Sequence, residues 1–279
     1  MRVAVLQLAY GDEEPVAERV ERVCELVRRQ AGHDLVVLPE LWAPGGFAYR
    51  DWEERAETLD GPVAQALGHA ARHAGVTLHG GSIVERGRPV APGGPGRWNT
   101  SLVYSPAGEL VATYRKIHRF GFRSGEPRLM EAGSEPVVVD VPVADGAPAR
   151  VGLSTCYDLR FPELYRALVD RGAEVFVVPA AWPAARVAHW RVLGLARAIE
   201  DQCVVVQCNT AGTHAGHEMG GRSQVVGPDG RVLAAAGTEE EVLSVEVDVP
   251  AVRRLRADFP VLADRRLPAT SGLLATGTR

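Results

Sequence analysis

Short apolar runs alternate along the chain with longer segments in which apolar residues recur every three or four positions. The short runs predict buried strands, and the recurring pattern predicts amphipathic helices. The predicted strands are residues 3–9, 35–38, 76–84, 137–141, 150–154, 173–179 and 203–209, and the predicted helices are about 15–30, 63–73, 161–171 and 185–201. This alternation is typical of an α/β protein built in layers.

Two hairpins interrupt the alternation, each with proline and glycine in a short turn. Their strands are residues 101–104 with 109–114, and 223–226 with 231–235. The Pro/Gly-rich stretch 88–96 reads as a spacer loop, and nothing in the chain reads as a linker. We therefore predict a single domain over residues 1–279, with a weakly ordered tail after Leu267.

The longest predicted helix, residues 185–201, has apolar residues along one side. They are Val187, Trp190, Leu193, Ala196 and Ile199. We expect this side to pack on a sheet, and we interpret His189 and Trp190 as packing residues.

Cys156 lies where the strand 150–154 gives way to the helix 161–171, which has Pro162 in its first turn. A proline there loses nothing, because its missing N–H would have no partner. Such a junction places free N–H groups and the positive end of a helix dipole beside the side chain. Both lower a thiol pKa and can hold an oxyanion, so Cys156 is a candidate nucleophile.

The alternative is that Cys156 only fills space, since cysteine is among the most buried residue types. Cys24, Cys203 and Cys208 fit that description. Cys156 differs from them because its neighbours Ser154, Thr155, Tyr157, Asp158 and Arg160 are polar. Position alone leaves the two interpretations equally open.

Two further positions favour the interpretation of Cys156 as a nucleophile. Glu40 follows the buried strand 35–38, where a carboxylate is placed to act as a general base, although a cap or surface role is the alternative. Lys116 ends the strand 109–114, where an ammonium can stabilise an oxyanion. It is the only lysine of the chain, and all other basic side chains are arginine. A single lysine among arginines indicates that this position needs a compact cation.

Composition narrows the class of protein. A formal net charge of −4, with scattered arginines, gives no reason to expect nucleic-acid or membrane binding. No apolar run approaches the ~20 residues of a membrane span, and the N-terminus does not resemble a signal peptide. Four cysteines without paired spacing predict neither disulfides nor a zinc site. We expect a cytoplasmic protein.

Pro39-Glu40, Tyr114-Arg-Lys116 and Cys156-Tyr-Asp-Leu-Arg-Phe-Pro-Glu163, in this order and spacing, resemble the Glu-Lys-Cys triad of the nitrilase superfamily of carbon–nitrogen hydrolases. The resemblance covers residues 1 to about 266. It is strongest to the omega-amidase or Nit-type branch, because Ala181-Trp-Pro183 and Arg186 follow. It implies an α/β fold with a four-layer α-β-β-α sandwich. It also implies hydrolysis of the terminal carboxamide of small 2-oxo acid or dicarboxylic acid amides.

The resemblance also implies a second catalytic glutamate, which Glu126 matches better than Glu131 on spacing. No metal or cofactor is implied, and relatives are commonly homodimers or larger homo-oligomers. The helix 161–171 could supply such an interface.

Three residues are predicted to bind the substrate. Tyr157 would supply a backbone N–H to the oxyanion, Trp182 a pocket wall, and Arg186 a bidentate partner for a substrate carboxylate. Arg186 could equally be a surface residue at a helix start. Arg160 and Arg123 are alternative cations, but we expect Arg160 and Glu163 to form a local structural pair.

Rival functions share the same triad. A nitrilase, an N-carbamoyl amino acid amidohydrolase and a general aliphatic amidase would all use it. A non-catalytic binding protein on the same fold is the alternative of another class, although all four catalytic positions are filled.

Overall fold

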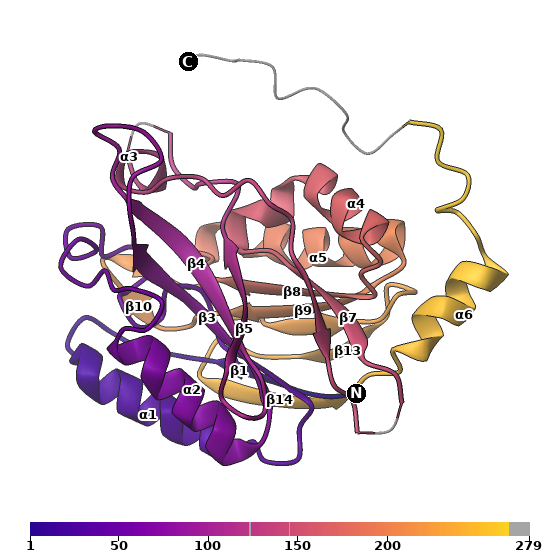
Figure 1. Ribbon diagram of the computed structural model, residues 1–279. Helices are drawn as coiled ribbons and strands as arrows, with labels where there is room; N and C mark the ends of the chain where they lie inside the picture. The colour runs from indigo at the N-terminus through magenta and orange to yellow at the C-terminus, as the bar shows by residue number, and fades with distance from the viewer. Residues whose placement is uncertain (123, 145, 268–279) are drawn as a thin grey trace.

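The computed structural model describes residues 1–122, 124–144 and 146–267. Over these residues, two six-stranded sheets pack face to face and helices cover the outer face of each (Figure 1). The predicted four-layer α-β-β-α sandwich is therefore confirmed. The tail after Leu267, for which we predicted weak order, lies outside the described residues.

Sheet one has the strand order β14-β1-β2-β3-β4-β5. Strands β1, β2 and β3 are parallel neighbours, and the other pairs are antiparallel. The strands are β1 (Arg2–Gln7), β2 (Leu35–Val37), β3 (Thr77–Arg86), β4 (Arg97–Tyr104), β5 (Leu110–Arg115) and β14 (Glu241–Glu246). The sequence pattern predicted all of these except β14.

Sheet two has the order β13-β12-β9-β8-β7-β6, with β7, β8 and β9 parallel and the other pairs antiparallel. The strands are β6 (Val138–Val141), β7 (Ala149–Leu153), β8 (Val175–Ala180), β9 (Val204–Asn209), β12 (Gln224–Val226) and β13 (Val232–Ala235). All six were predicted to within a few residues.

Alternation along the strands builds the layers. In β1, Val3 and Val5 belong to the core between the sheets, whereas Ala4 and Leu6 pack under the helices of sheet one. Helices α1 (Val16–Arg28) and α2 (Pro62–Ala74) cover sheet one, and α4 (Pro162–Asp170) and α5 (Val187–Asp201) cover sheet two.

Helix α5 buries most of the side that we predicted. Trp190 is fully buried, and Val187 and Leu193 pack against the same core, but Ile199 is 56% exposed. Gly194 is also buried, and an added Cβ there would lie 1.6 Å from the side-chain oxygen of Gln207 on β9. Gln207 also donates to the carbonyl of Trp190 at 2.9 Å. The buried surface of the helix therefore includes Gly194, which the apolar pattern did not predict.

Smaller elements connect these layers. They are α3 (Glu126–Leu129), the short ribbon β10 (Thr213–His214) with β11 (His217–Glu218), the 3-10 turns η1 (Cys156–Arg160) and η2 (Ala184–Arg186), and α6 (Pro250–Asp258). Among the described residues, no helix is both long and apolar enough to cross a membrane.

Candidate active site

Cys156 occupies the turn between β7 and α4, but the turn differs from the predicted one. The cysteine opens the 3-10 turn η1, and α4 begins only at Pro162. Its φ is +48°, in the left-handed region that residues with a Cβ rarely adopt. Such strain persists only where the surroundings hold the backbone firmly, and it is common at functional sites.

Asp158 holds this turn. One of its carboxylate oxygens accepts hydrogen bonds from the backbone N–H of Thr155 at 2.9 Å and from the hydroxyl of Tyr114 at 2.7 Å. The other accepts from the backbone N–H of His118 at 2.9 Å. Asp158 is fully buried, so it ties the cysteine turn to the end of β5. Sequence reasoning missed this role.

Glu40 lies in an equally constrained turn after β2. The next residue, Leu41, has a φ of +44°, and its N–H donates to the hydroxyl of Ser82 at 3.0 Å. A Cβ at Gly81 would lie 2.0 Å from the carbonyl oxygen of Pro39. Only glycine on β3 allows the backbone before Glu40 to pass this closely.

Lys116 lies between two carboxylates. Its Nζ is 2.7 Å from an oxygen of Glu40 and 2.9 Å from an oxygen of Glu126. Asn99 on β4 donates to the same two carboxylates, at 2.8 Å and 2.7 Å. The second oxygen of Glu40 accepts from the backbone N–H of Ala181 at 2.9 Å. Glu40, Lys116, Glu126 and Asn99 are each at most 3% exposed, so this is a buried, hydrogen-bonded polar cluster.

The structure brings Glu126, and not Glu131, to the lysine. Glu126 also accepts the backbone N–H of Phe120. Glu131 instead accepts the N–H groups of Val90 and Gly96, at 2.9 Å and 3.0 Å, and so holds the loop 88–96.

The electrostatics of Cys156 contradict one expectation. Burial raises the pKa of the Cys156 thiol well above its usual value; Glu40 adds to the rise, and Lys116 opposes it. The predicted lowering by a helix dipole is wrong, because α4 starts six residues later than the cysteine. The resting thiol is therefore neutral.

The pKa values of Lys116 and Glu126 depend on each other's charge. Burial by itself would lower the pKa of Lys116, but Glu126 and Glu40 raise it well above its usual value. Burial raises the pKa of Glu126, and Lys116 opposes the rise. A protonated ammonium between two carboxylates is the stable arrangement.

These groups line one pocket of about 410 Å³, its mouth included. The residues around it are Glu40, Gly46, Phe47, Tyr49, Trp52, Lys116, Phe120, Glu126, Cys156, Tyr157, Arg160, Ala181, Trp182, Pro183 and Arg186. All seven predicted site residues are among them. Within the described residues, no group of three or more His, Cys, Asp or Glu side chains is arranged to hold a metal ion.

Two arginines face the aromatic walls of the pocket. The guanidinium of Arg186 is 5.4 Å from the ring centroid of Phe120, and that of Arg160 is 4.7 Å from the ring of Trp182. The expected pair between Arg160 and Glu163 is wrong, because Arg160 turns to Trp182 and His189 instead. Arg123, the other cation considered, lies outside the described residues.

Residues 2–257 match the family model for carbon-nitrogen hydrolases. A 2-oxoglutaramate amidase of Paenarthrobacter nicotinovorans is 46% identical over 95% of this chain and 89% of its own length. The human omega-amidase NIT2 is 33% identical over 95% of each chain. The chain belongs to the carbon–nitrogen hydrolase family.

A solved structure supports the same assignment. The CN-hydrolase superfamily protein XC1258 of Xanthomonas campestris, which carries an arsenic adduct in its active site, superposes with a TM-score of 0.85. It is 29% identical and covers 97% of this hydrolase and 99% of its own chain. The predicted class of enzyme, an amidase with omega-amidase relatives, is confirmed.

Sequence reasoning also missed Asn99 in this hydrolase. Asn99 lies on β4, whose residues are almost all buried, but the predicted strand began only at residue 101. A buried amide requires partners, and here its partners are the two carboxylates.

Proposed function

We propose that this amidase hydrolyses the terminal carboxamide of small dicarboxylic or 2-oxo acids through a thioester on Cys156. The observation that carries the proposal is that a strained cysteine, a carboxylate and a doubly paired lysine meet in one pocket. The omega-amidase relatives support the substrate class.

The reaction starts with proton transfer from the thiol. Because burial raises the pKa of Cys156, the thiol needs a base, and Glu40 is the carboxylate beside it. The sulfur then attacks the carboxamide carbon. Lys116 and the backbone N–H of Tyr157 stabilise the oxyanion.

Collapse of this tetrahedral intermediate breaks the C–N bond. Glu40 returns the proton, so ammonia leaves and the acyl group stays on the sulfur as a thioester. Water then attacks the thioester carbon, and Glu40 takes its proton. Collapse of the second intermediate breaks the C–S bond, the carboxylic acid leaves, and Glu40 returns the proton to the sulfur of Cys156. The N–H of Ala181 fixes one oxygen of Glu40, which directs the other oxygen to Lys116.

Glu126 positions the lysine. It is the second anion on the ammonium, so Lys116 stays protonated and aimed into the pocket even when Glu40 carries the proton. Asn99 joins the two carboxylates at a fixed separation.

Arg186 is our candidate partner for the distal carboxylate of the substrate, with Arg160 as its rival. Both line the pocket, and a guanidinium binds a carboxylate through two parallel hydrogen bonds. Trp182 donates to the carbonyl of Arg186 at 2.8 Å and so fixes the turn that carries it.

Ammonia release from a panel of small molecules tests the function. The panel contains 2-oxoglutaramate, succinamate, glutamine, butyramide, an N-carbamoyl amino acid and a nitrile. We expect the omega-amides to exceed butyramide in kcat/KM by about tenfold or more, the value of one charge-assisted contact. A preference for butyramide would indicate a general aliphatic amidase, and turnover only of the carbamoyl compound or the nitrile would indicate those activities instead. No turnover in the panel would favour a binding protein.

Two variants separate the arginines. Arg186→Ala should remove most of the preference for omega-amides and leave the rate on butyramide nearly unchanged, because the distal contact only orients the carbonyl. Arg160→Ala is the matched control. If the preference survives Arg186→Ala and disappears in Arg160→Ala, Arg160 holds the carboxylate.

We further propose that the protein acts in the cytoplasm as one domain and as a homodimer or larger homo-oligomer. Four buried free cysteines support a reducing compartment. The exposed Val192 and Ile199 on α5 support an interface on the α4–α5 layer. Light scattering of Val192→Glu should then show a shift towards monomer.

A further inference from the structure

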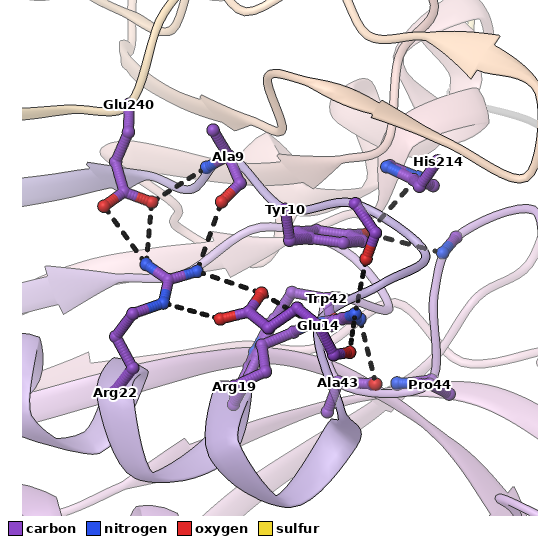
Figure 2. Close-up of polar contacts among 12 residues, drawn as sticks. Ala9, Tyr10, Glu14, Arg19, Arg22, Trp42, Ala43, Pro44, His214 and Glu240 are labelled. Atoms are coloured by element: carbon purple, nitrogen blue, oxygen red, sulfur yellow. Dashed lines mark hydrogen bonds and ion pairs between the residues drawn. The ribbon is translucent and has the colours of Figure 1, made fainter.

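Three buried side chains outside the pocket come together from distant parts of the chain (Figure 2). Tyr10 follows β1, Arg19 is on α1, and His214 is on β10. Each is at most 5% exposed, and none of them lines the pocket that contains Cys156. The proposed mechanism does not use them.

A chain of hydrogen bonds runs through this group. The N–H of Gly46 donates to the Tyr10 oxygen at 3.4 Å, and the Tyr10 hydroxyl is hydrogen-bonded to Nε2 of His214 at 3.3 Å. Burial raises the pKa of Tyr10, so its hydroxyl stays protonated. Burial, aided by Arg19 and opposed by Asp12, lowers the pKa of His214 to about 4, so its imidazole is neutral.

Stacking holds the rings in place. The rings of Tyr10 and His214 lie 4.3 Å apart and are inclined by 16°. The guanidinium of Arg19 packs over the Tyr10 ring at 4.2 Å. Arg19 also donates to the carbonyls of Trp42 and Ala43, at 3.0 Å and 3.4 Å, as Figure 2 shows. The group therefore makes hydrogen bonds to the backbone that follows Glu40, at Trp42, Ala43 and Gly46.

This backbone segment, which follows Glu40, forms one wall of the pocket. Gly46 and Phe47 line the pocket, and a Cβ at Gly46 would lie 2.6 Å from the Cβ of Ala181. The ring of Phe47 lies 4.5 Å from that of His217, in the same ribbon as His214. Movement of Tyr10 or His214 would therefore shift the wall that contacts the substrate.

We propose that Tyr10 and His214, supported by Arg19, are positioning residues that fix the Gly46–Phe47 wall and so set the affinity for the amide. They do not touch the reacting atoms. The proposal rests on the proposed function only in taking this pocket as the place where the amide binds.

Tyr10→Phe tests it most directly, because it removes the hydroxyl link and keeps the stacked ring. We expect KM for the preferred amide to rise about fivefold to tenfold, the effect of losing one buried hydrogen bond. The kcat should change by less than about twofold to threefold, since Cys156, Glu40 and Lys116 keep their partners. His214→Leu should behave like Tyr10→Phe, whereas His214→Gln, whose amide can donate or accept a hydrogen bond near the position of Nε2, should recover much of the loss.

Tyr104→Phe is the matched control. Its buried hydroxyl donates to the carbonyl of Ala64 at 2.8 Å, under the helices of sheet one and away from the pocket. This variant loses a comparable hydrogen bond, so it shows what a purely structural loss does to KM.

Amide hydrogen exchange supplies a readout that needs no substrate. Exchange of residues 44–49 should accelerate in Tyr10→Phe and stay at the wild-type rate in Tyr104→Phe. Equal KM values for the two variants, or unchanged exchange of residues 44–49, would overturn the positioning role. If exchange accelerates but the protein turns over no amide, the proposed function fails and the structural link stands.

Discussion

Sheet one and sheet two follow the same strand order. In each, three parallel strands form the centre, one antiparallel strand lies at one edge, and two antiparallel strands form the other edge. The strand ends carry different groups. Sheet one supplies the charged residues Glu40 and Lys116 together with Asn99, and sheet two supplies Cys156 and the backbone N–H of Ala181.

This difference shows how one topology serves two tasks. In sheet one, the turn after β2 and the end of β5 bring opposite charges together, and those charges satisfy each other when buried. In sheet two, the turn after β7 holds a neutral thiol in a strained conformation. The reaction needs both, and neither sheet contains a complete site by itself.

The largest expected effect comes from removing the contribution of sheet two. Cys156→Ala should lower kcat by about four orders of magnitude or more, as for a nucleophile that acts as part of a unit. The fold should persist, because the contacts among Lys116, the two carboxylates and Asn99 do not involve the cysteine side chain. Ammonia release and circular dichroism measure the two outcomes.

Cys203→Ala is the control for this prediction, because Cys203 is also buried but lies outside the pocket. It should retain turnover if it folds. Measurable turnover by a folded Cys156→Ala protein would end the thioester mechanism.

A smaller effect is expected from changing the shape of the cation in sheet one. Lys116→Arg keeps the charge but replaces a compact ammonium with a planar guanidinium between two buried carboxylates. We expect a loss of about two to three orders of magnitude in kcat, the usual cost of one oxyanion donor. A rate near that of the wild type would remove Lys116 from the mechanism.

The smallest effect compares the buried histidines of the two halves, His79 on β3 and His214 in the segment between β9 and β12. Burial lowers the pKa of each to about 4, below the usual value of 6.5. The unfolded state therefore takes up protons first as the pH falls from 6.5 towards 4, and the free energy of unfolding decreases. Each histidine should therefore lower the free energy of unfolding by about 2 kcal/mol at pH 5 relative to pH 7.

Urea unfolding at both pH values tests this for each half. His79→Gln and His214→Gln should each reduce the difference between pH 7 and pH 5, whereas His69→Gln, exposed on α2, should keep it. An unchanged difference in both buried-site variants would contradict the assignment.

The spacing of apolar residues predicted most of the fold, because it differs between strands, with a period of two, and helices, with a period of about 3.6. It missed β14, since Glu241–Glu246 is mostly exposed and gains its partner β1 only through contact with the other end of the chain. It also placed Ile199 on the buried side of α5, although this residue is 56% exposed, and it did not predict the close approach of Gly194 to Gln207 on another strand.

The site residues that belong to the family's motifs could be predicted from the sequence. Glu40, Lys116, Glu126 and Cys156 meet in one pocket, as the resemblance implied. Asn99 and Asp158 were missed because their roles depend on partners at distant positions. The direction of the Cys156 pKa was wrong because burial, which the local sequence does not show, raises it, and because α4 begins six residues after the cysteine.

The neutral state of Cys156 also bears on the chemical durability of the enzyme. Peroxides and alkylating reagents attack the thiolate rather than the thiol. A buried thiol with a raised pKa therefore presents less thiolate to such reagents than a thiol with the usual pKa. On the proposed mechanism, the reactive anion forms only as the amide arrives and Glu40 accepts the proton, which confines the nucleophile's reactivity to its substrate.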